Sequence, residues 1–230
     1  MSYKVEYNDL GLKDYKEVWD FQTTVFNRII ENKRDRQNPF SPGMLIFTEH
    51  PHVYTLGKSG SENNLLLDTE QLKKRNATYY RIDRGGDITY HGPGQIVGYP
   101  IFDLEMINIA LKEYIYRLEE AIIRTVAGCG INASRLAGGT GVWLDPDVPS
   151  RARKICAIGV RASRFVTMHG FAFNVNTDLS YFNSINPCGF IDKGVTSLEK
   201  ELGKKQDFES IKTSVRENLK EVFDLDWTNL

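Results

Sequence analysis

The segment 155–175 reads ICAIGVRASRFVTMHGFAFNV and combines strand-forming residues with glycine. Runs of this kind, bounded by turn residues, are typical of β-strands. The segment therefore predicts two strands, at 155–162 and 165–175, joined by a turn. Upstream, GVWL at 141–144 predicts a further strand, and the prolines and charges of 145–153 predict a loop that follows it.

Helices are predicted on both sides of this strand-rich centre. Apolar residues recur at three- and four-residue spacing over 15–33, 107–128 and 207–223, which places them on one face of a helix in each range. Shorter apolar or extended runs predict strands at 44–50, 53–56, 79–83 and 96–102. Helices first and last, with strands between them, indicate an α+β fold around a mixed or antiparallel sheet. We expect residues 1–230 to form a single domain.

Composition and charge exclude several classes of protein. Apolar residues make up 41% of the 230 residues, which is enough for a large core. The formal net charge of −1 disfavours a general nucleic-acid binder. The N-terminal stretch lacks the apolar core of a signal peptide, and no apolar run is long enough to cross a bilayer. We therefore expect a cytoplasmic protein that binds neither nucleic acid nor membrane.

The three cysteines are an odd number without tight spacing, which predicts free thiols and neither a disulfide framework nor a metal site. Cys129 ends a predicted helix and Cys156 lies in a predicted buried strand, so we interpret both as packing residues. Cys188 lies in the turn sequence Asn186-Pro187-Cys188-Gly189, which would expose its sulfur. Cys188 is therefore the preferred reactive thiol.

A reactive cysteine needs a neighbouring cation or base, because a free thiol is mostly protonated at neutral pH. Lys154, His91 and His169 are the upstream candidates. Lys154 precedes an apolar strand and would stand at a strand end that faces a cleft, although a lone lysine is usually solvated. His169 would suit a Cys–His pair. Spacing alone does not choose among them.

A glycine-rich stretch at 84–95 reads RGGDITYHGPGQ. It lacks the ending of a P-loop, and no G-x-G-x-x-G opens a helix there. One interpretation is a pair of tight turns around a short strand. The polar side chains of Arg84, Thr89, His91 and Gln95 favour a ligand-binding loop instead, in which glycine N–H groups would stabilise the oxyanion of an acyl transfer.

Several of these blocks, in this order, resemble one family. They are Arg84-Gly85-Gly86 to Thr89-Tyr90-His91, Gly94-Gln95 with Tyr99, Lys154 to Gly159, His169 to Asn174, and Asn186 to Gly189. This pattern is similar to that of the octanoyltransferases of lipoate synthesis, the lipoyl(octanoyl) transferases. The resemblance covers about residues 40–200, and several long motifs in register are highly specific.

The resemblance implies a fold like that of the biotin and lipoate protein ligases, an α+β domain with a large mixed β-sheet flanked by helices. It implies that Cys188 carries an acyl thioester and that Lys154 lowers the pKa of this thiol. His169 and His91 would be positioning groups. The residues that would line the substrate site are Arg84, Gly85, Gly86, Asp87, Ile88, Thr89, Tyr90, His91, Ala157, Ile158, Gly159, Gly170, Phe171 and Ala172.

The implied activity moves octanoyl from acyl carrier protein to a lysine of lipoyl domains, in 2-oxoacid dehydrogenase E2 subunits and the glycine cleavage H protein. No metal or cofactor is implied, because the octanoyl-phosphopantetheine of the carrier is a substrate. The alternatives are an ATP-dependent lipoate or biotin ligase, a non-catalytic module that binds acylated carriers, and a thiol hydrolase. Five basic residues near the predicted site would either steer an acidic carrier or form a solvated basic loop: Arg151, Arg153, Lys154, Arg161 and Arg164.

Overall fold

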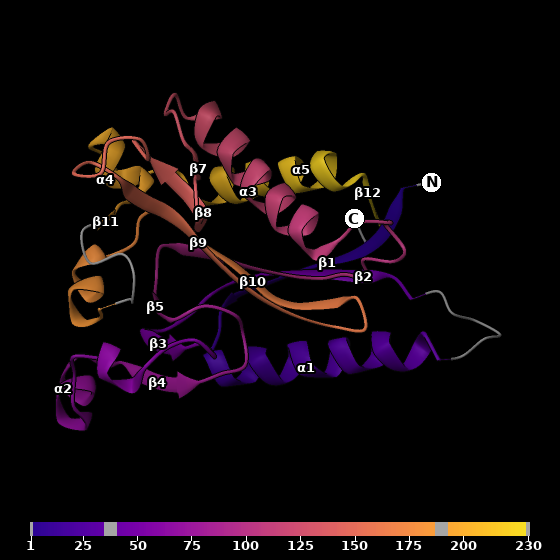
Figure 1. The fold of residues 1–230 in the computed structure, drawn as a ribbon, viewed down its shortest axis with the longest axis horizontal. Helices are drawn as coiled ribbons and strands as arrows, with labels where there is room; N and C mark the ends of the chain where they lie inside the picture. Colours follow the sequence, from indigo (N-terminus) through magenta and orange to yellow (C-terminus); the bar gives the residue numbers. More distant parts are fainter. Residues whose placement is uncertain (1, 35–40, 187–192, 229–230) are drawn as a thin grey trace.

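The structure is a computed structural model that describes residues 2–34, 41–186 and 193–228. Its main feature is a large sheet in the strand order β12-β1-β2-β6-β10-β9-β8-β7, with β11 paired to β9 (Figure 1). The strands of this sheet are β1 (Tyr3–Leu12), β2 (Gly43–Glu49), β6 (Gln95–Ile101), β7 (Ser134–Leu136), β8 (Gly139–Leu144), β9 (Arg153–Ser163), β10 (Val166–Asn174), β11 (Gly194–Val195) and β12 (Leu225–Trp227). The pairs β1–β2, β1–β12 and β11–β9 are parallel and the others are antiparallel, so the sheet is mixed, as predicted.

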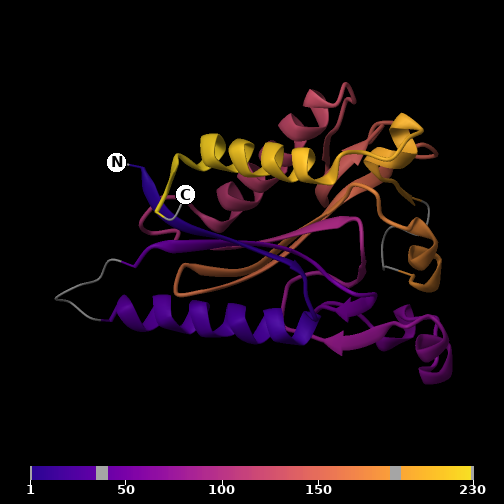
Figure 2. The same cartoon turned by 180° about the vertical axis from the view of Figure 1, so that it is seen from behind.

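Helices cover both faces of this sheet. The helix α1 (Tyr15–Asn32) lies on one face, while α3 (Leu111–Gly128) and α5 (Phe208–Phe223) lie side by side on the other (Figures 1 and 2). Successive side chains of a strand point to opposite faces of the sheet, so one strand contacts the helices on both sides. Leu45 and Phe47 of β2 pack toward α3 and α5, whereas Met44 and Ile46 pack toward α1. The predicted fold class, helices around a mixed sheet, is therefore confirmed.

A second, three-stranded sheet lies beside one end of the large one (Figure 1). Its order is β4-β3-β5, formed by β3 (Val53–Leu56), β4 (Thr78–Arg81) and β5 (Ile88–His91). The remaining elements are short: α2 (Thr69–Lys74), α4 (Leu198–Leu202), and the 3₁₀ turns η1 (Glu62–Asn64) and η2 (Leu179–Ser184). The glycine-rich segment 84–95 thus does form turns around a short strand, β5, at the border between the two sheets.

Two predictions of the local structure were wrong. The helix predicted from residue 107 begins only at Leu111, because Asn108 has a positive φ of 50° that an α-helix does not allow. The strand β1 was not predicted at all. Its alternation is weak because only two of its ten residues are buried, and it is held by pairing with β2 and with the distant β12.

Candidate active site

A cavity of about 410 Å³ lies where the two sheets meet. Most of the predicted site residues line it, from the glycine-rich loop and from β9 and β10: Arg84, Gly86, Asp87, Ile88, Thr89, His91, Lys154, Ala157, Ile158, Gly159, His169, Gly170, Phe171 and Ala172. Gly85 and Tyr90 are not among the lining residues. Tyr90 is buried in the apolar cluster of the small sheet, where its ring packs against Tyr54 and Tyr181.

Arg84 holds the glycine loop against its neighbours. Its guanidinium is buried and donates to the Thr55 carbonyl at 2.7 Å and to the Gly85 carbonyl at 3.0 Å. The Gly85 N–H in turn donates to the Val160 carbonyl of β9. The glycine loop lies so close to β9 that Gly159 has no room for a side chain, since a Cβ there would lie 2.9 Å from the Gly85 carbonyl oxygen. The loop and the Ala157–Gly159 motif therefore form one wall of the cavity.

His91 is held as a neutral ring. Its Nδ1 lies 2.9 Å from Oε1 of Gln95, and the ring stacks on Tyr15 with centroids 5.9 Å apart. Burial lowers the pKa of His91 to about 3, and the neighbouring His50 acts in the same direction. Burial also lowers the pKa of His50 to about 4, and its Nε2 bonds the Tyr99 hydroxyl at 2.8 Å. These groups orient the cavity wall without carrying charge at neutral pH.

His169 lies far along the same wall. Its φ is +61°, and its Nε2 is 2.9 Å from the Asp83 carboxylate, which also pairs with Arg161. The hydrogen bond from His169 lowers the pKa of Asp83. In the sheet His169 is opposite Val160, six residues beyond Lys154 on β9, which is about 20 Å of extended strand. His169 and Lys154 therefore line opposite ends of the cavity.

Lys154 is the second residue of β9, and its side chain turns into the cavity. Its Nζ lies 4.6 Å from the centre of the Trp143 ring. Burial lowers the pKa of Lys154 to about 8, and the nearby Arg84 acts in the same direction, while Cys156 and Glu119 oppose it. A lysine of this kind exchanges its proton near neutral pH, as acid–base and nucleophile-activating groups do.

The reactive cysteine predicted at Cys188 lies outside the described residues. The described chain on either side of it is held by main-chain hydrogen bonds. The Asn186 N–H donates to the Asn64 carbonyl at 2.8 Å, and the Gly194 N–H donates to the Ala152 carbonyl at 2.9 Å. Val195 then pairs directly with Lys154.

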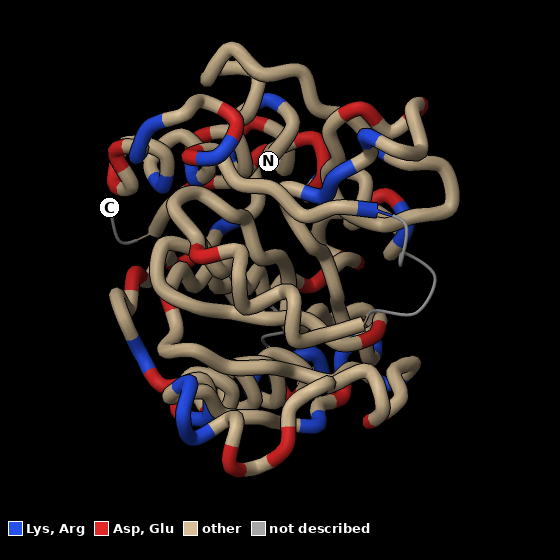
Figure 3. The backbone as a smooth tube through the Cα atoms, turned by 90° about the vertical axis from the view of Figure 1, so that its left-hand side faces the viewer, with Lys and Arg blue, Asp and Glu red and all other residues tan. Residues whose placement is uncertain are grey.

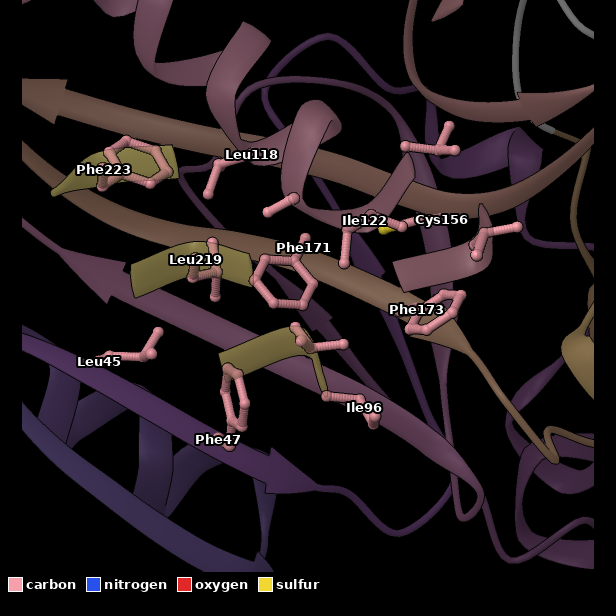
Figure 4. Packing of buried hydrophobic residues seen from close by; sticks show 14 of the residues in the cluster. Leu45, Phe47, Ile96, Leu118, Ile122, Cys156, Phe171, Phe173, Leu219 and Phe223 are labelled. Atoms are coloured by element: carbon pink, nitrogen blue, oxygen red, sulfur yellow. The ribbon is translucent and has the colours of Figure 1, made fainter. Parts of the chain in front are cut away.

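The other two cysteines are packing residues, as predicted. Cys156 is fully buried among apolar side chains that include Ile122, and burial raises the pKa of its thiol (Figure 4). Cys129 is half-buried at the end of α3, and burial raises its thiol pKa too. Neither lines the cavity.

The comparisons with known proteins agree with this geometry. Residues 14–220 match the model of the lipoyl protein ligase A/B catalytic domain. An octanoyltransferase of Parabacteroides distasonis is 56% identical over 94% of this chain and 97% of its own length. One of Bacteroides fragilis is 59% identical over 89% of this chain and 91% of its own. The chain belongs to the octanoyltransferase family.

Solved structures show that the octanoyltransferase family shares its fold with ligases. The bipartite lipoate protein ligase of Thermoplasma acidophilum superposes with a TM-score of 0.72 over 99% of this chain and 87% of its own, at 13% identity. A lipoate-protein ligase A bound with ATP gives a TM-score of 0.67 over 100% and 89%, at 14% identity. At these identities the likeness concerns the fold alone.

The basic residues around this octanoyltransferase-family site are largely paired. Arg153 binds Glu201 and Asp145, Arg151 also binds Asp145, and Arg161 binds Asp83. Acidic and basic residues alternate over the side of the molecule that carries the small sheet and α4 (Figure 3). Arg151, Arg153 and Arg161 thus have local counter-charges, and both interpretations of the five basic residues stay predictions.

Sequence reasoning missed several residues that build the site of this octanoyltransferase-family member. The Trp143 ring contacts the Lys154 ammonium group, the Asp83 carboxylate hydrogen-bonds the His169 ring, and the Tyr15 ring stacks on His91. Asp83 and Tyr15 are distant in sequence from their partners, Trp143 lies opposite Lys154 on the neighbouring strand β8, and none of the three stands in a motif block. In the described ranges, no group of three or more His, Cys, Asp or Glu side chains is placed to hold a metal ion, and no helix is long and apolar enough to cross a membrane.

Proposed function

We propose that this protein transfers an octanoyl group from acyl carrier protein to a lysine of lipoyl domains, through a thioester on Cys188. Two observations support the proposal. The relatives that cover nearly all of the chain are named octanoyltransferases. The cavity also carries a lysine of lowered pKa at Lys154, directly beside the strand that follows the Cys188 segment.

In the first step the Cys188 thiolate attacks the carbonyl carbon of the carrier's thioester. A carbon–sulfur bond to Cys188 forms, the bond to the phosphopantetheine sulfur breaks, and that sulfur takes up the proton which Cys188 lost. One thioester replaces another, so the step is close to neutral in energy. The charged Lys154 favours the thiolate by attraction between opposite charges.

In the second step the amine of the acceptor lysine attacks the Cys188 thioester. A carbon–nitrogen bond forms, the carbon–sulfur bond breaks, and the amine loses a proton to Lys154 or to the leaving thiolate. A lysine whose pKa lies near 8 is suited to this exchange, since the best acid–base groups titrate near the working pH. Amide formation drives the reaction forward.

The position of Lys154 is the observation that favours it over His169 as the partner of Cys188. In the sequence Cys188 stands between Asn186 and Gly194, whose N–H groups are held by Asn64 and Ala152. The chain that follows it returns beside Lys154 at Val195, whereas His169 lies at the other end of the cavity. His169 and His91 then act as positioning groups.

The partners in this proposal are those that the resemblance to the octanoyltransferases implies. The donor is the octanoyl-phosphopantetheine of acyl carrier protein, and the acceptors are lipoyl domains of E2 subunits and the glycine cleavage H protein. The reaction needs no metal, cofactor or ATP, takes place in the cytoplasm, and uses residues 1–230 as one catalytic domain. The polar groups around the cavity, including Arg84, Gly86 and Thr89, orient the thioester.

The test is the intact mass of the protein after it is mixed with octanoyl carrier protein. We expect an octanoyl adduct that hydroxylamine removes. The adduct should be absent from Cys188→Ser and present in Cys156→Ser and Cys129→Ser. Transfer to a lipoyl domain should proceed without ATP. An undiminished adduct on Cys188→Ser would refute the thioester, and strict ATP dependence would indicate a ligase.

A further inference from the structure

Glu119 is a buried carboxylate that the reaction described above does not use. It lies in the middle of α3, is 7% exposed, and is not among the residues that line the cavity. A buried carboxylate is costly unless its oxygens are hydrogen-bonded and its charge is balanced. The partners of Glu119 therefore indicate why it is kept there.

Its two oxygens join three elements. One accepts from the Gly141 N–H at 2.9 Å, and the other accepts from Nε of Arg135 at 3.0 Å. Arg135 is itself fixed, because it donates to the carboxylate of Glu120 and to the Tyr116 carbonyl, both at 2.9 Å, and its guanidinium lies 3.6 Å from the centre of the Tyr116 ring. Glu119 thus ties α3 to β7 and β8.

The tie to β8 reaches the side chain of Lys154. Gly141 has φ +117°, and a Cβ there would lie 2.5 Å from the Cys156 carbonyl oxygen and 3.5 Å from Cε of Lys154. The backbone of β8 therefore runs directly along the lysine stem. The residues around Gly141, namely Gly139, Thr140 and Trp143, line the cavity. The hydrogen bond from Gly141 to Glu119 holds this part of the wall in place.

Glu119 also supplies charge near Lys154. Among the described residues, the titratable groups that shift the pKa of Lys154 include Arg84 from the glycine loop, Cys156 on its own strand and Glu119 from α3. Lys193, next to β11, lines the same cavity, and Cys188 acts as an anion in the proposed reaction. The pKa of the Cys156 thiol is raised by burial, so this group is neutral at ordinary pH. Of these described groups, Glu119 is thus the one that carries a negative charge. It raises the pKa of Lys154, whereas the positive charge of Arg84 lowers it.

We propose that Glu119 is a positioning residue for Lys154: it fixes the β8 wall along the lysine stem and supplies the buried negative charge that keeps the lysine protonated. The inference rests on the proposed role of Lys154 and deepens it. Because Glu119 acts from behind the wall, it sets the pH range over which Lys154 exchanges its proton, without touching either substrate.

The test measures the titration of Lys154 directly in the full chain. Protein labelled with ¹³C at lysine Cε gives one signal for Lys154, assigned by its loss in Lys154→Arg. We expect a midpoint near pH 8 in the unaltered protein. Glu119→Gln keeps an oxygen for Gly141 but removes the charge, and should lower the midpoint by about half a pH unit or more. The alkaline limb of the acylation rate should move in the same direction.

Glu120→Gln is the matched control, because Glu120 binds the same arginine from the next position of the helix. It should leave the midpoint unchanged. Arg135→Gln gives a second test, with a shift in the opposite direction, that does not depend on the folding of Glu119→Gln. It removes the cation that balances Glu119, so the negative charge of Glu119 should raise the titration midpoint of Lys154. An unchanged midpoint in Glu119→Gln, or an equal shift in Glu120→Gln, would overturn the inference. A shift without any octanoyl adduct would support the inference and refute the proposed function instead.

Discussion

The ammonium nitrogen of Lys154 lies 4.6 Å from the centre of the Trp143 ring, in the wall of the cavity. The face of an indole attracts a cation, whereas burial disfavours it. Burial prevails here, since the pKa of Lys154 is lowered to about 8. The protein therefore carries a charged group that its own fold disfavours, and this group is ready to release a proton near neutral pH.

Replacement of this lysine should stabilise the fold while it removes activity. The unfolded chain binds the lysine proton up to a pKa of 10.5, and the folded chain only up to about 8. Stability therefore rises with pH between these values and is lowest below them. Lys154→Met should raise the free energy of unfolding near pH 7 by about 3 kcal/mol, and the gain should vanish above about pH 11. Urea unfolding at both pH values checks this, and an equal gain at both would contradict it.

The buried histidines should make the protein sensitive to acid. The pKa values of His91 and His50 are lowered to about 3 and about 4, whereas unfolded histidine has a pKa of 6.5. The unfolded state therefore binds more protons below pH 6.5, and stability falls as the pH falls from there. His91→Gln should show a smaller loss of stability between about pH 7 and pH 5 than the unaltered protein. Urea unfolding at these pH values measures the difference, and parallel losses would refute the assignment.

The ion pair of Arg153 with Glu201 should matter for acylation. Two guanidinium nitrogens of Arg153 lie 2.6 Å from the two carboxylate oxygens of Glu201, and the Thr196 hydroxyl donates to the same carboxylate at 2.5 Å. This pair holds the segment after β11 against the start of β9. Glu201→Gln should lower the free energy of unfolding by about 1–3 kcal/mol and slow adduct formation.

The control for this pair is Glu199→Gln, two residues earlier at the start of α4, whose side chain forms no ion pair within the described part of the chain. Thermal unfolding and the time course of the adduct give the two readouts. A Glu201→Gln protein that acylates at the normal rate would show that the pair serves stability alone.

Tyr181 should contribute through its ring. The ring stacks on the neighbouring rings of His52 and Tyr90, with centroids 4.1 Å and 4.8 Å away, and these stacks hold η2 on the small sheet. Tyr181→Ala should cost about 2 kcal/mol of stability and reduce adduct formation, because η2 leads into the segment that carries Cys188. Tyr181→Phe keeps both stacks and should retain most of the activity. Equal losses in the two variants would assign the effect to the hydroxyl, which bonds the Arg75 carbonyl.

Much of the fold could be predicted from the sequence, because the signal was local. The helical spacing from Tyr15 gave α1 to within one residue, and the strands at 53–56 and 155–162 lie inside the observed β3 and β9. Prediction failed where structure depends on single backbone angles or distant pairing. The positive φ of Asn108 delays α3, and β1 depends on β12.

The residues of the candidate site could likewise be predicted only in part. The residues of the motif blocks line the cavity because they lie on adjacent strands, β9 and β10, whose order could be read along the chain. Trp143, Asp83 and Glu119 could not be found in this way. Asp83 reaches His169 across elements remote in sequence, and Glu119 reaches Gly141 from a different element, the helix α3. Trp143 meets Lys154 through the register of β8 and β9, which the residue types alone do not give.

The chain on either side of the Cys188 segment is anchored by main-chain groups, Asn186 to Asn64 and Gly194 to Ala152. Such bonds place no demand on the identity of a side chain. The anchoring bonds themselves would therefore survive a change of residue at position 64 or 152. What such a change would lose is the local packing, because the Asn64 side chain also donates to the Asp87 carboxylate at 2.9 Å and Ala152 is buried. The two ends of the Cys188 segment are thus held by the course of the main chain, and side-chain substitutions test only what surrounds it.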